Sequence, residues 1–206
     1  MKNLGILVFL LLFIFVGCKS SDNDDDDNND DSVDDDTDDD DDTDDDDNDD
    51  SGDDDDDSVH DVWEDPLTGL MWQNDSDCCY EWDEAKTHCD DLVWSDYSDW
   101  RLPSISELRS LIRGCEDSES DGSCGVDDSC LDSSCWSGSC GGCIYDDGPA
   151  DGCYWPSTLN GICGMYWSSS EISDYLTPYA WFVDFHYGDI SGSGDGYDQD
   201  VRCVRN

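Results

Sequence analysis

The sequence predicts an α+β domain with two helices, an antiparallel sheet and a disulfide-rich inserted loop. Apolar residues recur at helical spacing over residues 81–93, and a helix-capping sequence begins at Ser104. Residues 180–187 alternate with the period of two that is typical of a strand. Helices early in a domain and strands late in it favour the α+β class.

A β-hairpin is expected at the start of the domain. Residues 62–63 and 70–73 are short apolar segments, and the turn sequence between them contains Pro66 and Gly69. This Pro-then-Gly pattern predicts two antiparallel strands joined by a turn.

Two helices follow the hairpin. The apolar face of the first, over residues 81–93, consists of Trp82, Ala85, Cys89, Leu92 and Val93. In the second helix, Ser104 stands at the N-cap and Glu107 at the position that completes a capping box. Gly114 is the residue that we expect to end this helix.

Three strands are expected after a cysteine-rich insertion at residues 114–164. They are residues 165–169, 180–187 and 201–205. In the middle one, Trp181, Val183, Phe185 and Tyr187 form one aromatic face.

The N-terminus resembles a bacterial lipoprotein signal peptide over residues 1–17. Lys2 is followed by an apolar run that is too short to span a bilayer, and Gly17 precedes Cys18 in the manner of a lipobox. Cleavage there makes Cys18 the lipidated first residue, whereas an ordinary signal peptide would leave Cys18 incidental. Lys19 favours transport to an outer membrane, so the expected location is the bacterial cell surface or the periplasm.

Residues 18–58 are expected to form a disordered polyaspartate tether, and residues 59–206 one domain. Segment 22–57 contains 26 aspartates and one apolar side chain, Val33, so it cannot bury enough surface to fold. The chain has a formal net charge of -48, and the domain itself has 30 acidic and six basic residues. Such a surface repels nucleic acid, anionic lipid and sulfated glycans, which leaves cations, neutral sugars, basic proteins or other copies bridged by divalent ions.

The thirteen cysteines support an exported, disulfide-bonded protein. Setting Cys18 aside for lipid leaves an even number, twelve, and eight of these lie in the insertion. Cys140 and Cys143 have the spacing of half a zinc site or of a redox pair, but structural crosslinking is the favoured interpretation.

Several ordered motifs resemble the Lcl C-terminal domain family, a bacterial extracellular domain. They are residues 65–73, Trp82 with Ala85 and Cys89, residues 99–103 with Glu107 and Leu108, residues 166–169, Ala180 with Trp181, and residues 201–205. The resemblance implies a C-type-lectin-like fold, related to that of formylglycine-generating enzymes, with its N- and C-terminal strands side by side. It also implies a disulfide between the first helix and the last strand, Cys89–Cys203. Cys78 and Cys79 then either form a vicinal bridge or reach into the inserted loop.

Candidate ligand-binding residues are few. Trp167 and Trp181 offer an aromatic platform for a sugar ring if they are not core residues, and Arg101 is either a ligand contact or a partner of Glu107. Arg202 is also expected to have a carboxylate partner. The three histidines, His60, His88 and His186, show no catalytic triad or metal-binding pair, and we expect them to be structural.

Calcium is the best candidate cofactor, because carboxylates crowd a Gly-rich turn at Asp195, Asp198 and Asp200. The alternative is a solvated acidic loop, and the sequence lacks the calcium-dependent sugar motifs of true C-type lectins. We therefore expect a non-catalytic surface module, anchored in the membrane by lipid, that binds or adheres to an extracellular glycan or protein. The alternatives are an extracellular enzyme of the formylglycine-generating-like fold group and a Ca²⁺-crosslinked coat component.

Overall fold

The computed structural model describes residues 61–206. The signal peptide, Cys18, the tether and His60 therefore lie outside the described residues. Within residues 61–206, no helix has both the length and the apolar character needed to cross a bilayer.

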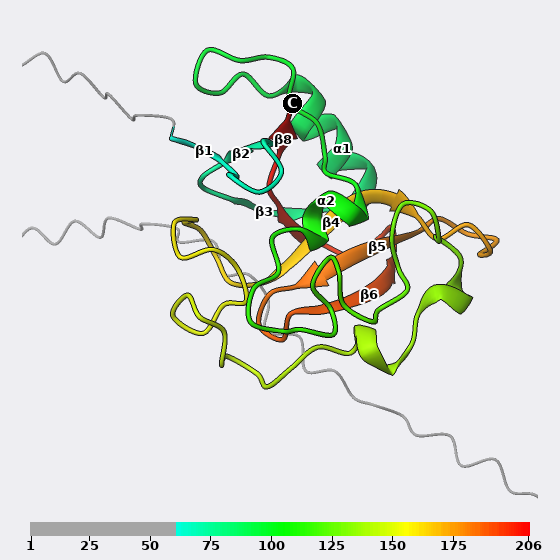
Figure 1. Ribbon diagram of the computed structural model, residues 1–206. Helices are drawn as coiled ribbons and strands as arrows, with labels where there is room; N and C mark the ends of the chain where they lie inside the picture. Colours follow the sequence, from blue (N-terminus) through cyan, green and yellow to red (C-terminus); the bar gives the residue numbers. More distant parts are fainter. Residues whose placement is uncertain (1–60) are drawn as a thin grey trace, which may run out of the picture. The chain divides into compact units, whose positions relative to one another are not determined.

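The first sheet joins the two ends of the domain. It contains β1 (Val62–Glu64), β2 (Met71–Gln73) and β8 (Val204–Arg205), all antiparallel. The β1–β2 turn is stabilised by the Asp65 carboxylate, which accepts hydrogen bonds from the Leu67 N–H (3.0 Å) and the Thr68 hydroxyl (2.8 Å). The hairpin is confirmed, and the N- and C-terminal strands lie side by side (Figure 1).

The second sheet has five strands in the order β3-β7-β4-β5-β6. Its strands are β3 (Asp77–Tyr80), β4 (Met165–Glu171), β5 (Tyr179–Asp184), β6 (Asp189–Gly194) and β7 (Gln199–Val201). Neighbouring strands are antiparallel except β4 and β7, which pair in parallel. The sheet is therefore mixed at one pair and otherwise antiparallel.

Both predicted helices are present and shorter than expected. Helix α1 (Trp82–Asp91) ends before Leu92, where the backbone becomes extended. Helix α2 (Ile105–Arg109) begins with the predicted capping box. The chain then continues in tighter turns, in which the N–H groups of Leu111 and Ile112 bond to carbonyls three residues earlier, so regular α-helix stops at Arg109.

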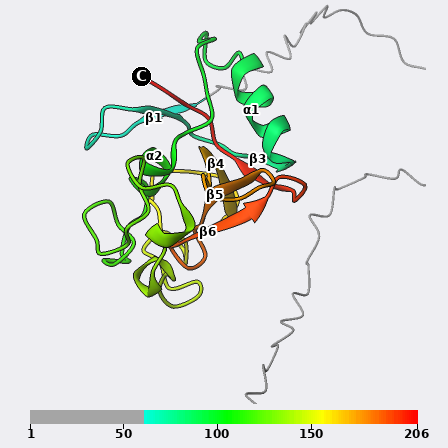
Figure 2. The ribbon, with the colours of Figure 1, turned by 90° about the vertical axis from the view of Figure 1, so that its right-hand side faces the viewer.

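The five-stranded sheet is buried on both faces. Phe182 and Trp167 belong to a core cluster with the α1 residues Trp82, Ala85 and Cys89. Their neighbours belong to a second cluster with α2 and the inserted loop: Tyr166, Trp181 and Val183. Because successive strand residues point to opposite faces, α1 and the inserted loop must cover different sides of the sheet, as Figure 2 shows.

Disulfides hold the inserted loop together. Its eight cysteines pair with one another: Cys115–Cys143, Cys124–Cys140, Cys130–Cys135 and Cys153–Cys163. Because Cys140 and Cys143 have different partners, they form neither half a zinc site nor a redox pair. The expected Cys89–Cys203 disulfide is confirmed and links α1 to the segment between β7 and β8.

Candidate functional site

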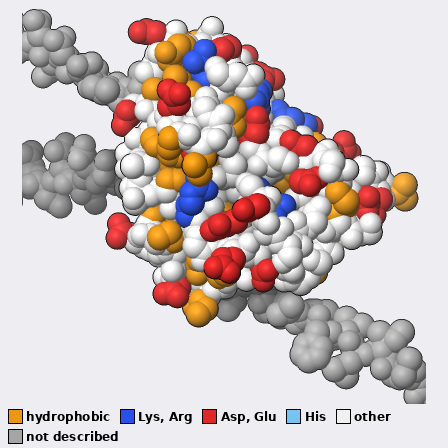
Figure 3. Space-filling model, in the orientation of Figure 1, with side chains coloured by type: hydrophobic (Ala, Val, Ile, Leu, Met, Phe, Trp, Pro, Cys, Tyr) orange, Lys and Arg blue, Asp and Glu red, His pale blue; other side chains and the backbone are white. Residues whose placement is uncertain are grey.

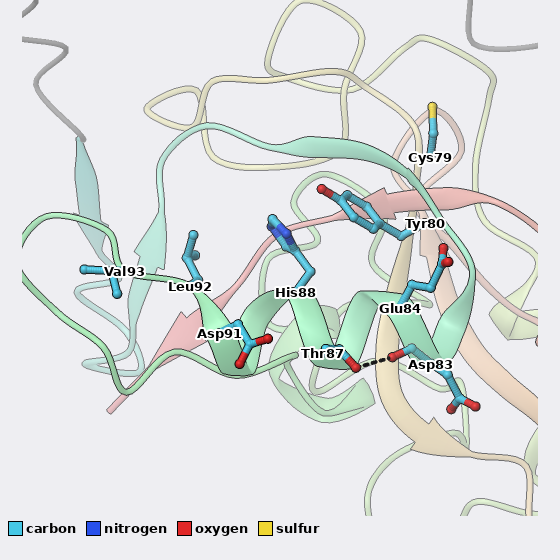
Figure 4. Close-up of a pocket in the computed structure, with 9 residues that line it drawn as sticks. All are labelled: Cys79, Tyr80, Asp83, Glu84, Thr87, His88, Asp91, Leu92 and Val93. Carbon is cyan, nitrogen blue, oxygen red and sulfur yellow. Dashed lines mark hydrogen bonds between the residues drawn. The ribbon is translucent and has the colours of Figure 1, made fainter.

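An open groove of about 740 Å³ lies between α1 and the segment that leads into it from β3. We call it the α1 groove. It is lined by Cys79, Tyr80, Asp83, Glu84, Thr87, His88, Asp91, Leu92 and Val93 (Figure 4). The lining combines three carboxylates with an imidazole, a phenol ring and an apolar end.

Helix α1 presents its residues to the groove because its opposite side is anchored. Trp82, Ala85 and Cys89 are buried against the sheet. Glu84 and His88, one turn apart, therefore face Tyr80, while Asp83 and Thr87 point away from it (Figure 4). The groove is thus built on a regular helix that a disulfide fixes.

A chain of hydrogen bonds fixes His88. Its Nε2 lies 3.0 Å from Oδ2 of Asp77, and the same oxygen accepts a hydrogen bond of 2.9 Å from the buried Gln73 amide. Oε1 of Gln73 in turn accepts from the N–H of Cys203, the residue bonded to α1 through Cys89. The imidazole is therefore held from the core of the domain.

Tyr80 packs against His88 with ring centroids 4.6 Å apart and planes inclined by 34°. Burial, followed by the negative charge of Asp77, raises the pKa of Tyr80 above its ordinary value of 10.0. The phenol is consequently neutral at physiological pH and offers both a hydrogen-bond donor and a ring face.

Every basic side chain in residues 61–206 is already engaged within the domain. Arg101 forms a bidentate ion pair with Glu107, in which both N–O distances are 2.6 Å. The other five pair with carboxylates, lie over aromatic rings or bind backbone carbonyls: Lys86, Arg109, Arg113, Arg202 and Arg205. Acidic side chains are spread over the face shown in Figure 3, and basic ones are fewer.

A carboxylate partner was expected for both Arg101 and Arg202, and the structure shows one for Arg101 alone of the two. The Arg101–Glu107 pair is confirmed, and its two parallel hydrogen bonds occupy the guanidinium edge that a ligand would use. The expectation of a carboxylate for Arg202 is wrong. Its hydrogen bonds go to the carbonyls of Gln73, Asn74 and Asn160, because it is sealed in the core with 1% of its surface exposed.

The structure places Trp167 and Trp181 in the core. Their exposed fractions are 0% and 2%, and their indole N–H groups donate to the carbonyls of Tyr80 and Leu131. Neither ring presents a face to solvent, because both faces of the sheet are covered. The two tryptophans therefore do not form the aromatic platform that the sequence suggested.

The three aspartates of the expected calcium site are not brought together. Asp198 is exposed, whereas Asp200 is buried. The Asp200 carboxylate packs so closely against Gly164 that a side chain at position 164 would collide with it. Two groups of three potential ligands lie within 4.8 Å in residues 61–206, and neither includes Asp195, Asp198 or Asp200. Both groups contain disulfide-bonded cysteines, whose sulfurs are not available as thiolate ligands.

His186 lies outside the α1 groove, in the turn between β5 and β6. Its Nδ1 is 2.6 Å from Oδ1 of Asp146, and Tyr145 stacks on it with ring centroids 5.1 Å apart. Sequence reasoning missed the α1 groove because β3 has no alternating pattern, and because Asp77, the hydrogen-bond partner of His88, is eleven residues away from it and is itself held by Gln73, four residues further.

Comparison with known proteins gives one result that bears on identity. The family model of the Lcl C-terminal domain matches residues 61–205, which is more than half of the chain. The searches of curated proteins and of solved structures found no match, so the likeness to C-type lectins stays a prediction. The matched segment includes the hairpin, both helices and all the strands described above, and this chain therefore belongs to the Lcl C-terminal domain family.

Proposed function

We propose that this domain is a non-catalytic binding module that holds an extracellular glycan or protein in the α1 groove. The observation that carries the proposal is the combination of an acid-lined groove with a domain whose six basic side chains are all engaged internally. Ligands that are neutral or positively charged fit this combination, because an anionic ligand meets only repulsion there.

The openness of the groove favours binding over catalysis. His88 shares a hydrogen bond with Asp77 and is packed on Tyr80, an arrangement that orients a ring for contact. Stabilisation of a charged transition state depends on a site from which water is excluded, and a shallow surface groove does not exclude it. The groove instead offers carboxylate acceptors and a ring face, which suit sugar hydroxyls or the basic side chains of a protein.

The five disulfides fit an extracellular or periplasmic domain. We propose that lipid on Cys18 anchors the chain to the bacterial membrane and that residues 18–58 hold the domain away from the surface. Radiolabelled palmitate should label the wild-type protein and not the Cys18→Ser variant. Equal labelling of both would overturn the proposed anchor.

The binding proposal is tested with the mature protein on arrays of neutral glycans, sulfated glycans and extracellular proteins. We expect binding to neutral glycans or basic proteins and none to sulfated glycans. For any ligand found, the double variant Glu84→Gln/His88→Ala should lower affinity roughly tenfold, equivalent to about 1.4 kcal/mol. Glu116→Gln, an exposed charge that does not line the groove, is the matched control.

Two results would contradict the proposal. One is strongest binding to sulfated glycans, which the acidic surface should repel. The other is an unchanged affinity of Glu84→Gln/His88→Ala for every ligand that the wild-type protein binds, because the ligand would then lie elsewhere.

A further inference from the structure

Cys78 and Cys79 occupy a β-bulge in β3. Asp77 pairs with Val201 and Tyr80 with Gln199, so these two cysteines lie opposite the single residue Asp200. Cys79 has a φ of +71°, in the left-handed region that residues other than glycine rarely adopt. In a regular strand successive side chains point to opposite faces, and the bulge removes this alternation at the cysteine pair.

The bulge brings the two sulfurs together. Their Sγ atoms are 2.8 Å apart, and both residues are exposed. Non-bonded carbon atoms prefer about 3.5–4.0 Å, and sulfur is larger, so this distance is shorter than an ordinary contact. It is longer than the roughly 2.05 Å of a disulfide. The two thiols are thus held together in a position from which a bond forms with a small movement.

We propose that Cys78 and Cys79 form a reversible vicinal disulfide in the exported protein. The other ten cysteines of residues 61–206 form five bridges among themselves, so a link from this pair into the loop would require one of those bridges to break. The sulfur contact therefore favours the vicinal bridge over a link to the loop.

The oxidant is a protein disulfide of the kind that an exported thiol oxidase supplies. One cysteine loses its proton to solvent, and its thiolate attacks the oxidant, forming a mixed disulfide and releasing one oxidant thiolate, which takes up a proton. The neighbouring thiolate then attacks the mixed disulfide, the vicinal S–S bond forms, and the second oxidant thiolate leaves. Two thiols lose two electrons and two protons, and the oxidant disulfide becomes a dithiol.

The position of the pair makes this bridge a switch for the α1 groove. Cys79 lines the groove, and Tyr80, which packs on His88, is the next residue. The bridge fixes the backbone of the bulge and hence the position of Tyr80 at the side of the groove. Reduction of the bridge by an exported dithiol releases this constraint on Tyr80. Exposed disulfides are also the ones that reductants reach first.

The sequence provides a clean test by mass spectrometry. Trypsin cleaves after Lys19 and Lys86, and no lysine or arginine lies between them, so the peptide of residues 20–86 contains Cys78 and Cys79 and no other cysteine. The mature protein is blocked with N-ethylmaleimide in denaturant and digested without reduction. We expect this peptide to appear on its own, unlabelled, and two hydrogen masses lighter than the dithiol. A doubly labelled peptide, or one linked to another cysteine peptide, would overturn the proposal.

The switch is tested by mild reduction of the folded protein. Dithiothreitol followed by maleimide should label peptide 20–86 roughly tenfold faster than any other cysteine peptide. The NMR signals of the His88 ring should shift on this reduction, because Tyr80 moves beside it. Cys78→Ser/Cys79→Ser, which has no bond to reduce, is the control and should show no shift. Labelling at the same rate as the other five bridges, or an equal shift in the control, would contradict the switch. Neither measurement depends on whether the groove binds a ligand.

Discussion

At the level of single residues, the domain buries charged groups whose cost is met in different ways. Arg202 is sealed in the core and donates to three backbone carbonyls, with Trp155 and Tyr166 against its guanidinium group. Asp189 has less support, because backbone hydrogen bonds reach its carboxyl but its Oδ1 is buried without a hydrogen-bond partner among the described residues. The carbonyl contacts offset part of the cost of burying Arg202, whose Nε also has no hydrogen-bond partner among the described residues, whereas ionisation of Asp189 opposes folding at neutral pH.

Replacing Arg202 should show how much its carbonyl contacts contribute. Arg202→Met fills a similar volume but leaves the carbonyls of Gln73, Asn74 and Asn160 without this donor, so we expect a loss of about 3 kcal/mol in the free energy of unfolding, measured with urea. Arg205→Met, which removes a surface pair with Asp99, should cause only a small loss. Equal losses in the two variants would show that the buried carbonyl contacts are not special.

The stability of the domain should fall as the pH rises from about 4 to 7. Burial raises the pKa of Asp189 from 3.8 to about 7, with help from the charge of Asp184, and burial raises that of Asp200 to about 6. In this window the folded state holds protons that the unfolded state has lost, so ionisation favours unfolding.

Asp189→Asn tests this pH dependence directly. At pH 7.5 the variant should be more stable than the wild type by roughly 2 kcal/mol, and at pH 4 the two should agree closely. Thermal unfolding followed across the pH range measures the difference. Asp198→Asn, in an exposed turn, is the control and should leave the pH slope unchanged. A variant whose advantage is the same at both pH values would argue against the buried charge as its cause.

At the level of secondary structure, local signals predicted what local physics decides. The Ser104–Glu107 capping box and the Pro66–Gly69 turn act within a few residues, and both are present in the structure. The expected strand 180–187 is in fact β5 followed by a turn, because Gly188 adopts a φ of +63° and the chain reverses. Strand β3 escaped prediction because the bulge at Cys78–Cys79 removes its alternation. The α1 groove was out of reach for the same reason.

The capping box of α2 should be worth more than an ordinary N-cap. The Ser104 hydroxyl accepts from the Glu107 N–H at 3.3 Å and donates to Asp128 in the inserted loop at 2.7 Å. We expect Ser104→Ala to lower the free energy of unfolding by about 1–2 kcal/mol, as measured with urea. Ser120→Ala, at an exposed position of the inserted loop, should be close to neutral. A loss below about 0.5 kcal/mol for Ser104→Ala would mean that water replaces both bonds.

At the level of the whole domain, the two ends of the chain and the inserted loop are held by different means. The N-terminal hairpin pairs with the last strand, while the inserted loop, which is poor in aliphatic side chains, depends on its four bridges and on Arg109. The guanidinium group of Arg109 donates to the carbonyls of Ser118, Glu119 and Val126, which ties the loop to α2. A small domain with an acidic surface thus gains rigidity mainly from crosslinks.

Because crosslinks restrict the unfolded chain, their contributions should follow the length of the loop that each closes. Cys89–Cys203 spans 114 residues and Cys130–Cys135 spans five. Loop entropy predicts losses of about 5 and about 2 kcal/mol when each bridge is removed by paired Cys→Ser substitution. The first value should be somewhat lower in practice, because the bridges inside this span already shorten the effective loop of the unfolded chain. Urea unfolding of the two double variants measures the difference, and each serves as the control for the other. If removal of the short bridge costs as much as removal of the long one, the bridges act by holding the folded loop and not by restricting the unfolded chain.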